Sequence, residues 1–378
     1  MRLLYLTRSH TGHDARWLRV LAGRGLQVGF LPLQAVDSTS FSREHPGVDL
    51  LASPMMRSNA GTTLLEAATA RVGLQIRAWN PDVIVAGPLT DAGYLAMRIA
   101  PERTLLMSWA FDVLHEAIVD SAAADRVRVT LAAAHYVFAD CEAVLAHCEA
   151  LAGRRFRQAC VVPWGLSEAD KPEPHLGWRQ RFGAEKSKVV LCPRGFSPVY
   201  RPEVVVASFA QAFARNESLR LWLAGSDGLQ SPVEQMVNDL GLRGVVRFLG
   251  RLNQADLAGC FAEADVYLSC ADSDGTSISL LQAMYAGLPC VVTDLPSNHE
   301  WLEPMGGWFA AAGRSEEFSR GLSEAADLSP AARAQIAASH RARVGQRADL
   351  AANLPRLLQT IETIAGRIPI HSRQPVAP

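Results

Sequence analysis

The chain has 378 residues, of which 49% are hydrophobic and 20% are charged, and its formal net charge is -1. This length suits two domains, and the hydrophobic content allows each domain to bury a core, which excludes extensive disorder. A chain so close to neutral lacks the basic excess that is typical of nucleic-acid-binding proteins, so we expect no nucleic acid among its partners.

The apolar run Met1–Thr7 is too short for a signal peptide, and no stretch approaches about 20 uninterrupted apolar residues. We therefore expect a cytoplasmic protein, and we leave open a peripheral contact with the inner face of the membrane. Residues 15–21, Ala-Arg-Trp-Leu-Arg-Val-Leu, suit either an anionic membrane surface or, as is more usual, a helix packed on its own sheet.

Seven cysteines are scattered along the chain without a Cys-x-x-Cys pair, and several lie inside apolar runs. This distribution is typical of small buried thiols in a reducing compartment, so we expect no zinc site among them.

Short apolar runs alternate with longer helical patterns, such as residues 14–25, 61–79 and 202–216. The expected strands are 3–7, 28–33, 83–86, 104–108, 136–139, 160–163, 189–192, 219–224, 245–249, 266–269, 290–293 and 308–310. Strands that alternate with helices predict an α/β fold with parallel sheets, and near-continuous apolar runs predict strands covered on both faces.

A polar, proline-containing stretch at 167–175 separates two such series. We therefore expect an N-terminal Rossmann-like domain over residues 1–168 and a C-terminal Rossmann-like domain over 169–365, with a last helix that can pack back on the first domain. Residues 366–378 are expected to form a flexible tail.

The most informative stretch is 273–289, S-D-G-T-S-I-S-L-L-Q-A-M-Y-A-G-L-P, which follows an expected strand. Gly275 permits a sharp turn, Thr276 or Ser277 can cap a helix, and a Gly-x-Pro sequence ends that helix. The first turn of the helix presents free N–H groups at the carboxyl end of a sheet, where a phosphate binds well. An ordinary capped helix of a βαβ unit would show the same local pattern.

This stretch resembles the signature of the retaining glycosyltransferases of family 4 (group 1), E-G-F-G-L-x-x-L-E-A-M-A-x-G-x-P-V-V. The chain reads D-G-T-S-I-S-L-L-Q-A-M-Y-A-G-L-P-C-V-V, so Asp274 stands at the first glutamate and Gln282 at the second. The resemblance implies the GT-B fold, in which two Rossmann-like domains face a cleft. It also implies that Asp274 contacts donor-sugar hydroxyls and that Gln282 contacts the ribose, with an amide in place of a carboxylate.

Other segments extend the resemblance over the donor half. Arg194 matches an arginine that binds the donor pyrophosphate, and Arg201 is the nearest basic substitute for a lysine that this chain lacks. Gly225 and Arg251 lie in segments that resemble those near the donor and its base, and Glu300 ends a segment that resembles a loop before a helix. The expected donor-binding residues are Arg201, Gly225, Arg251, Gly275, Thr276, Ser277, Ile278, Gln282 and Glu300.

In the first half, the resemblance places the acceptor side at Gly12 and His13, in a glycine-bearing loop after the first strand. Asp112, in a segment that resembles W-G-S-D-V, either orients an acceptor hydroxyl and assists its proton transfer or caps a helix. We expect Asp274, Arg194 and Asp112 as catalytic residues, and we expect no metal.

These features predict a glycosyltransferase that moves a sugar from a nucleotide-diphosphate sugar to an acceptor hydroxyl with retention and without a cofactor. The donor is a UDP-sugar by default, with a GDP-sugar open, and the acceptor is a saccharide or a lipid-linked molecule of bacterial surface polysaccharide or glycoconjugate synthesis. A GT-B nucleotide-sugar 2-epimerase and a non-catalytic sugar-nucleotide-binding protein are the alternatives. An NAD enzyme is less expected, because no G-x-G-x-x-G follows a strand.

Overall fold

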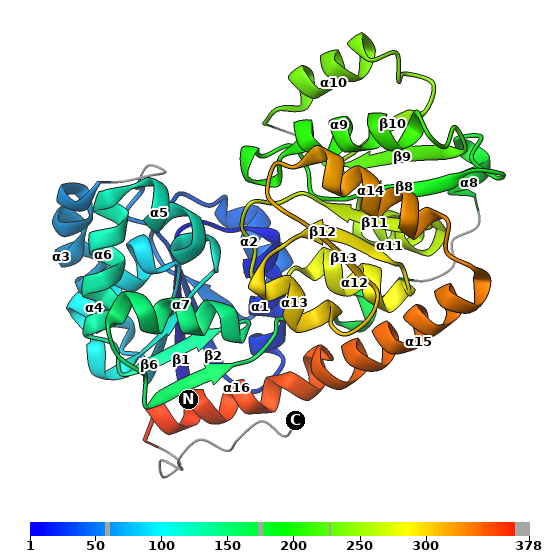
Figure 1. Ribbon diagram of the computed structural model, residues 1–378. Helices are drawn as coiled ribbons and strands as arrows, with labels where there is room; N and C mark the ends of the chain where they lie inside the picture. Colours follow the sequence, from blue (N-terminus) through cyan, green and yellow to red (C-terminus); the bar gives the residue numbers. More distant parts are fainter. Residues whose placement is uncertain (57–60, 173–176, 227, 367–378) are drawn as a thin grey trace. The chain divides into compact units, whose positions relative to one another are not determined.

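The computed structural model describes residues 1–56, 61–172, 177–226 and 228–366. These residues form two compact units (Figure 1). Unit 1 contains Met1–Val162 and the described residues from Leu354 onward, and unit 2 contains Pro163–Asn353. Each unit has its own parallel sheet, so the expected α/β class with two Rossmann-like domains is confirmed.

Unit 1 contains a seven-stranded parallel sheet in the order β3-β2-β1-β4-β5-β6-β7. Its strands are β1 (Arg2–Thr7), β2 (Gln27–Pro32), β3 (Val48–Leu50), β4 (Val83–Ala86), β5 (Thr104–Met107), β6 (Tyr136–Ala139) and β7 (Gln158–Val161). The strand order reverses between β1 and β4, and open α/β sheets bind ligands beyond the carboxyl ends of the strands at such a switch point. The sequence analysis missed β3, because Val48-Asp49-Leu50 is too short to give a recognisable apolar run.

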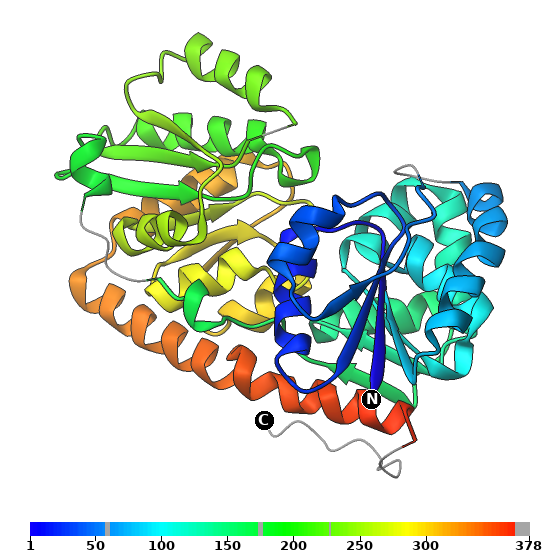
Figure 2. The ribbon, with the colours of Figure 1, turned by 180° about the vertical axis from the view of Figure 1, so that it is seen from behind.

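Helices pack on this sheet (Figure 2). They are α1 (Gly12–Ala22), α2 (Ser38–Glu44), α3 (Thr62–Trp79), α4 (Tyr94–Ile99), α5 (Ala117–Val119), α6 (Ser121–Ala132), α7 (Glu142–Ala152) and α16 (Leu350–Ile364), with the shorter turns η1 (Leu89–Gly93), η2 (Pro101–Arg103) and η3 (Asp112–Glu116). Helix α1 buries Trp17, Leu18 and Leu21. The apolar side chains of residues 15–21 therefore belong to the core of unit 1, which contradicts the membrane-surface interpretation of this segment.

Unit 2 contains a six-stranded parallel sheet in the order β10-β9-β8-β11-β12-β13, with its switch point between β8 and β11. Its strands are β8 (Lys188–Cys192), β9 (Leu219–Ala224), β10 (Val246–Gly250), β11 (Val266–Ser269), β12 (Cys290–Thr293) and β13 (Gly307–Ala310). Its helices are α8 (Trp178–Arg181), α9 (Pro202–Phe213), α10 (Gln230–Asp239), α11 (Gln254–Glu263), α12 (Ile278–Ala286), α13 (Pro296–Leu302), α14 (Ser315–Ala326) and α15 (Pro330–Arg347), with the turns η4 (Glu168–Asp170) and η5 (Pro198–Tyr200).

The central strands of unit 2 are buried on both faces, as their apolar runs predict. Every residue of β11 and β12 is buried. Alternate side chains enter different cores: Val190 packs with residues of α9 and α14, whereas Val189 packs with residues of α11 and α12. This two-sided burial fixes the register of the strands and therefore the positions of the loops that follow them.

The division between the units differs from the expected domain boundary after residue 168. Unit 2 already begins at Pro163, because Leu166 is buried in its core and forms backbone hydrogen bonds with Ala348 (2.6 Å) and Leu350 (3.1 Å). The end of α16 belongs to unit 1, in line with the expectation that the last helix can pack back on the first domain. The expected tail from residue 367 onward and residues 173–176 of the expected linker lie outside the described residues.

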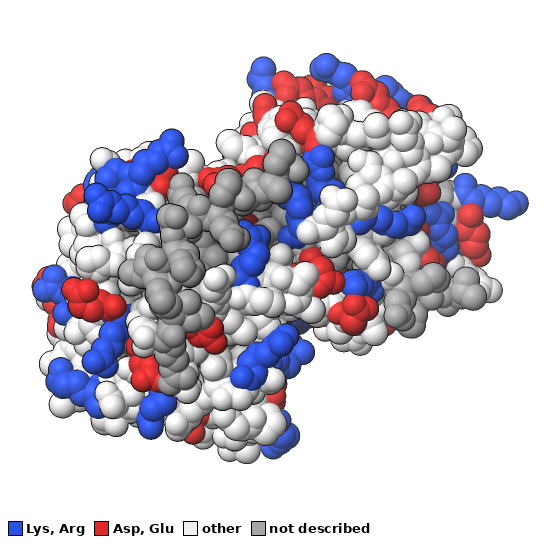
Figure 3. Space-filling model, turned by 90° about the horizontal axis from the view of Figure 1, so that it is seen from below, with Lys and Arg blue, Asp and Glu red and all other residues white. Residues whose placement is uncertain are grey.

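The surface carries no extended patch of one charge on the face that Figure 3 shows, where basic and acidic side chains are interspersed. Within the described ranges, no helix has the length and apolar character that crossing a membrane requires.

Candidate functional site

Two of the expected catalytic residues meet at the switch point of unit 2. Arg194 follows β8, and Asp274 follows the neighbouring strand β11. Arg194 Nη2 donates a hydrogen bond to Asp274 Oδ2 at 2.7 Å. The parallel sheet therefore brings together two side chains that lie 80 residues apart in the sequence, at the position where this fold class binds ligands.

Hydroxyl groups hold the other side of the Arg194 guanidinium. Arg194 Nη1 donates to Ser277 Oγ at 2.6 Å and to Ser279 Oγ at 3.0 Å. The Ser279 hydroxyl also lies 2.9 Å from the Tyr267 hydroxyl and 3.0 Å from Ser277 Oγ. The ring of Tyr200 lies under the guanidinium, with 4.3 Å from its centroid to the Arg194 carbon. Of these four neighbours, the sequence analysis named only Ser277.

The Arg194–Asp274 pair is largely shielded from solvent, with 10% of the arginine side chain and 21% of the aspartate side chain exposed. Burial alone would lower the pKa of Arg194, but the Asp274 carboxylate, together with Tyr200, Tyr267 and Cys192, outweighs burial and raises that pKa above its ordinary value. Burial raises the pKa of Tyr267 to about 12, so its hydroxyl stays neutral. The site thus presents a permanently charged guanidinium in a fixed orientation.

The first turn of α12 begins beside this guanidinium. Ser277 is the N-cap of the helix, as the sequence allowed, and its Oγ accepts a hydrogen bond from Leu280 N at 3.4 Å. Gly287 ends the helix in the left-handed conformation, with φ of 87°. Gly275 is buried and Ile278 is partly buried. The first turn of α12 and Arg194 therefore lie side by side, and the start of a helix is a position that suits an anion.

Helix α13 fixes the loop that carries Asp274. Ser297 Oγ donates to the Asp274 carbonyl at 2.8 Å, and Trp301 Nε1 donates to Thr276 Oγ1 at 3.3 Å. The expected position of Glu300 was wrong, since Glu300 lies within α13 and not in a loop before a helix. The proline at the first position of Pro296–Leu302 starts the helix earlier than the sequence comparison suggested.

A contact between two glycines fixes the loop that carries Arg194. Gly225 has φ of 131°, and a Cβ atom on it would lie 2.3 Å from the Gly195 Cα. Gly195 N also donates to the Ala224 carbonyl at 3.0 Å. Only glycine fits at residue 225, and its close approach sets the position of the residue next to Arg194.

Gln282 uses its amide to hold the chain that enters unit 2. The side chain is 4% exposed, and its Nε2 donates to the Asp170 carbonyl at 2.9 Å. Gln254 Nε2 donates to Asp170 Oδ1 at 2.7 Å. A glutamate at residue 282 would have no proton to donate to this carbonyl, which gives a physical reason for the amide. Contact between Gln282 and a ribose stays a prediction.

The two other expected basic residues are less suited to a phosphate. Arg201 lies between two carboxylates, with Nε 2.8 Å from Asp272 Oδ2 and Nη1 3.3 Å from Glu203 Oε1. These two negative charges outweigh its single positive charge. Arg251 is exposed after β10. Binding of a donor by Arg201 and Arg251 stays a prediction.

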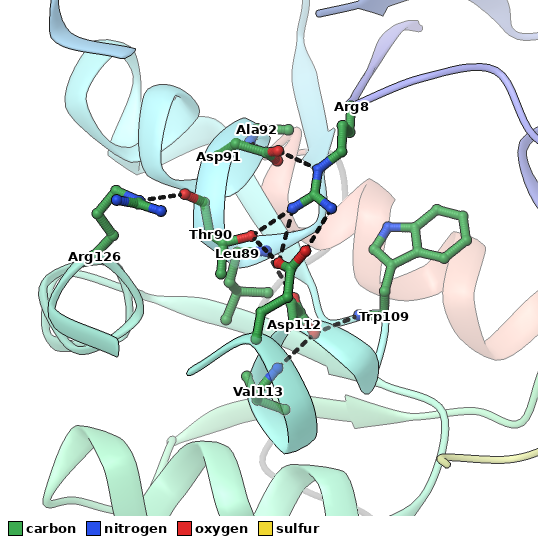
Figure 4. A network of polar contacts seen from close by, with 10 residues as sticks. Arg8, Leu89, Thr90, Asp91, Ala92, Trp109, Asp112, Val113 and Arg126 are labelled. Atoms are coloured by element: carbon green, nitrogen blue, oxygen red, sulfur yellow. Dashed lines mark hydrogen bonds and ion pairs between the residues drawn. The ribbon is translucent and has the colours of Figure 1, made fainter. Parts of the chain in front are cut away.

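Asp112 does not have the position that direct contact with an acceptor requires. Asp112 is 0% exposed, and its Oδ2 accepts a hydrogen bond from Leu89 N at 2.7 Å. Its Oδ1 accepts from Trp109 N and Val113 N at 3.1 Å (Figure 4). The same oxygen accepts from Ser108 Oγ at 2.9 Å. Burial raises its pKa to about 6, although these hydrogen bonds oppose the shift. Asp112 therefore joins the loop after β5 to the loop after β4, which gives it a structural role, and its assignment as a catalytic residue stays a prediction.

The sequence analysis overlooked a charged cluster at the switch point of unit 1. Arg8, which follows β1, contacts Asp91 through Nε, Glu116 through Nη1 at 2.6 Å, and Thr90 Oγ1 at 2.8 Å (Figure 4). Arg126 Nε donates to the Thr90 carbonyl at 2.8 Å. The segments after β1, β4 and β5 and helix α6 supply these side chains, so the order of the strands would have been needed to predict the cluster.

Gly12 and His13 form the first turn of α1, and both are exposed. The capping box between Thr11 and Asp14 sets this turn, with Thr11 N donating to Asp14 Oδ2 at 2.7 Å. The His13 ring lies edge-on to the Trp109 ring, with 5.9 Å between their centroids. Both residues therefore lie at the carboxyl edge of the unit 1 sheet, where the sequence analysis expected an acceptor.

Two Rossmann-like units, the second with an arginine and a helix start at its switch point, define a protein of the GT-B class. Solved structures share this fold over nearly the whole chain. HepE (Alr3699) of Anabaena in complex with UDP has a TM-score of 0.78 at 20% identity and covers 96% of this chain and 100% of that one. Sucrose-phosphate synthase of Thermosynechococcus elongatus has a TM-score of 0.78 at 17% identity, with 97% and 99% covered.

Residues 177–343 match the family described as Glycosyl transferases group 1, so the chain carries a group 1 glycosyltransferase domain. A curated relative is the GDP-mannose-dependent monoacylated alpha-(1-6)-phosphatidylinositol monomannoside mannosyltransferase of Corynebacterium glutamicum, 25% identical over 46% of this chain and 47% of that protein. The N-acetyl-alpha-D-glucosaminyl L-malate synthase of Bacillus anthracis is 29% identical over 30% of each chain. The alignments thus span less than half the length of these relatives.

Proposed function

We propose that the protein transfers a sugar from a nucleoside-diphosphate sugar to an acceptor hydroxyl, with retention of the anomeric configuration. The observation that carries this proposal is the hydrogen-bonded Arg194–Asp274 pair at the switch point of a group 1 glycosyltransferase domain. The pair places one cation and one carboxylate beside the first turn of α12, which is the composition that a diphosphate attached to a sugar requires.

In the proposed reaction, the bond between the anomeric carbon and the diphosphate oxygen breaks, and its electron pair goes to that oxygen. The oxygen of the acceptor hydroxyl bonds to the anomeric carbon on the same face, and its proton passes to the departing diphosphate. Arg194 and the N–H groups at the start of α12 stabilise the resulting negative charge. The contacts of Arg194 with Ser277 and Ser279 hold the guanidinium in place before the donor binds, so little reorganisation is needed during the reaction. Asp274 orients the hydroxyls of the donor sugar.

We assign the donor to unit 2 and the acceptor to unit 1. A UDP-sugar is the first donor to test, because the similar HepE structures contain UDP or UDP-glucose, and a GDP-sugar is the second, because the mannosyltransferase relative is described as GDP-mannose-dependent. The acceptor is a saccharide or a lipid-linked molecule of bacterial surface polysaccharide or glycoconjugate synthesis. We place the reaction in the cytoplasm, at or near the inner face of the membrane.

The proposal is tested with Arg194→Ala and Asp274→Asn. Removing a charge that stabilises the leaving group typically costs about 10² to 10³ in kcat, and we expect this loss for Arg194→Ala. Arg314→Ala is the control, since the Arg314 side chain is 69% exposed in the same unit and lies at the start of α14. Transfer at the parent rate by both site variants would show that the site assignment is wrong.

The same protein preparations separate transfer from the two alternatives. Exchange of hydrogen at C2 of the donor sugar without an acceptor would indicate an epimerase. Nucleotide binding that is unaccompanied by donor turnover across a broad acceptor panel would indicate a binding protein.

A further inference from the structure

Three metal-ligating side chains meet in unit 1, outside the charged cluster at its switch point. His10 lies in the loop between β1 and α1, whereas Glu44 and His45 lie at the end of α2. One ligand atom from each residue lies within 4.8 Å of the other two. His10 Nε2 is 3.0 Å from His45 Nε2, and His45 Nε2 is 3.8 Å from Glu44 Oε1.

Aromatic packing holds the two imidazoles in this arrangement. The His10 ring packs edge-on against Phe30 and Phe41, with 5.7 Å and 5.2 Å between centroids. The His45 ring lies 4.9 Å from the Phe41 ring, and Phe30 and Phe41 stack on each other at 5.1 Å. The ligand atoms therefore point toward each other from an apolar surround, which limits the freedom that binding would remove.

The polar contacts of His45 all lie on the side that faces His10. Its side chain is 0% exposed, and its Nδ1 has no hydrogen-bond partner within the described part of the chain. A single shared proton between the two Nε2 atoms is the alternative arrangement.

Two of the three donor separations are close to those of a zinc site, and the third is within 4.8 Å. Tetrahedral Zn²⁺ binds imidazole nitrogen at about 2.0–2.1 Å, which places neighbouring ligand atoms about 3.3 Å apart. The observed separations of 3.0 Å and 3.8 Å lie on either side of this value. The Glu44 side chain is 47% exposed and can therefore move by the small distance needed without disturbing the core.

We propose that His10, Glu44 and His45 bind one Zn²⁺ ion, with water as the fourth ligand. Two neutral imidazoles and one carboxylate are a ligand set that zinc prefers. The ion would join the loop before α1 to the end of α2 and so fix the turn that begins at Gly12. The site belongs to unit 1 alone and takes no part in the chemistry proposed for unit 2. The zinc proposal can therefore be tested independently of the proposed sugar transfer.

The test is a titration of the metal-stripped, full-length protein with Zn²⁺ in competition with a colorimetric chelator. We expect one equivalent of Zn²⁺ per chain, and an affinity at least tenfold lower in His10→Ala and in Glu44→Gln. His135→Ala is the matched control, because His135 lies 3.7 Å from Glu102 in an exposed pair without a second imidazole. Glu44→Gln changes an exposed side chain and keeps the test valid even where His10→Ala folds poorly.

A second measurement reports the ligand geometry. Co²⁺ in place of Zn²⁺ should give the intense visible absorption of tetrahedral coordination in the parent and not in His10→Ala, and Zn²⁺ should raise the melting temperature of the parent alone. The proposal is overturned if the parent binds no stoichiometric Zn²⁺, or if both variants retain the parent affinity. In either case, the His10–His45 contact is a shared-proton hydrogen bond only.

Discussion

Replacing Ser279 by alanine tests the hydroxyl network that positions Arg194. The change removes the group that lies 3.0 Å from Arg194 Nη1 and 2.9 Å from the Tyr267 hydroxyl. Tyr267 is 0% exposed, so its hydroxyl would remain buried without this partner. Leaving such a group unsatisfied costs about 1–3 kcal/mol, and we expect the free energy of unfolding of Ser279→Ala to fall by this amount.

A double-mutant cycle with Tyr267→Phe isolates the contact. Tyr267→Phe alone should cost about 0.5–1.5 kcal/mol, because the Ser279 hydroxyl keeps Arg194 and Ser277 as neighbours. The double variant removes both partners, so its cost should be smaller than the sum of the two single costs by about 0.5–2 kcal/mol. Urea unfolding followed by tryptophan fluorescence measures all four proteins.

Turnover provides the readout that links this network to Arg194. Because Ser279→Ala removes one of the contacts that orient the guanidinium, we expect kcat to fall about tenfold with a smaller change in KM. Ser208→Ala is the control: the Ser208 hydroxyl is also buried but donates to the Val204 carbonyl within α9, at 2.6 Å. Additive unfolding energies, or equal kcat values for Ser279→Ala and the control, would refute the reasoning.

Three further changes test individual assignments. Gln282→Glu should lower the free energy of unfolding by about 1–3 kcal/mol, because a carboxylate cannot donate to the Asp170 carbonyl. We expect no tighter binding of a nucleotide, and tighter binding in a titration would contradict this prediction. Asp112→Asn should destabilise unit 1 by a similar amount, because an amide NH₂ would face Leu89 N, and kcat per folded molecule should stay unchanged. A lower kcat at unchanged stability would support a catalytic role for Asp112. Burial lowers the pKa of His340 from 6.5 to about 4, so the folded protein favours the neutral imidazole. The free energy of unfolding should therefore be retained above pH 6.5 and should decrease as the pH falls toward 4. His340→Gln should flatten this part of the stability–pH curve, and an unchanged curve would show that His340 does not cause the loss.

Local sequence patterns predicted the elements of this fold well. Runs such as Val266–Ser269 and Cys290–Thr293 are strands with the expected bounds, because two-sided burial requires apolar residues throughout. The caps of α12 were also readable, since a serine before the helix and Gly287 after it act within one turn of the chain. Strand β3 was missed, because three residues carry too little pattern.

Contacts between distant segments could not be predicted from such patterns. The amide of Gln282 bonds a carbonyl 112 residues away, and nothing near either residue in the sequence indicates this pairing. The complete burial of Asp112 likewise depends on the loop after β4, which supplies the Leu89 N–H. The prediction that Arg194 and Asp274 lie close together came from the resemblance to a family, which supplied a three-dimensional relation that the local pattern lacks, and the two side chains do form a hydrogen bond.

The assignment of α16 to unit 1 has a consequence for how the protein is made. Leu354, Leu357 and Ile361 are buried, and Arg356 Nη2 donates to the Val161 carbonyl at 3.3 Å. Unit 1 is therefore assembled from two stretches of chain separated by the whole of unit 2. During synthesis, the first stretch leaves the ribosome long before the second. The apolar surface that Leu354, Leu357 and Ile361 cover in the folded protein is therefore exposed until the end of the chain is made, and unit 2 is the first unit whose residues are all available for folding.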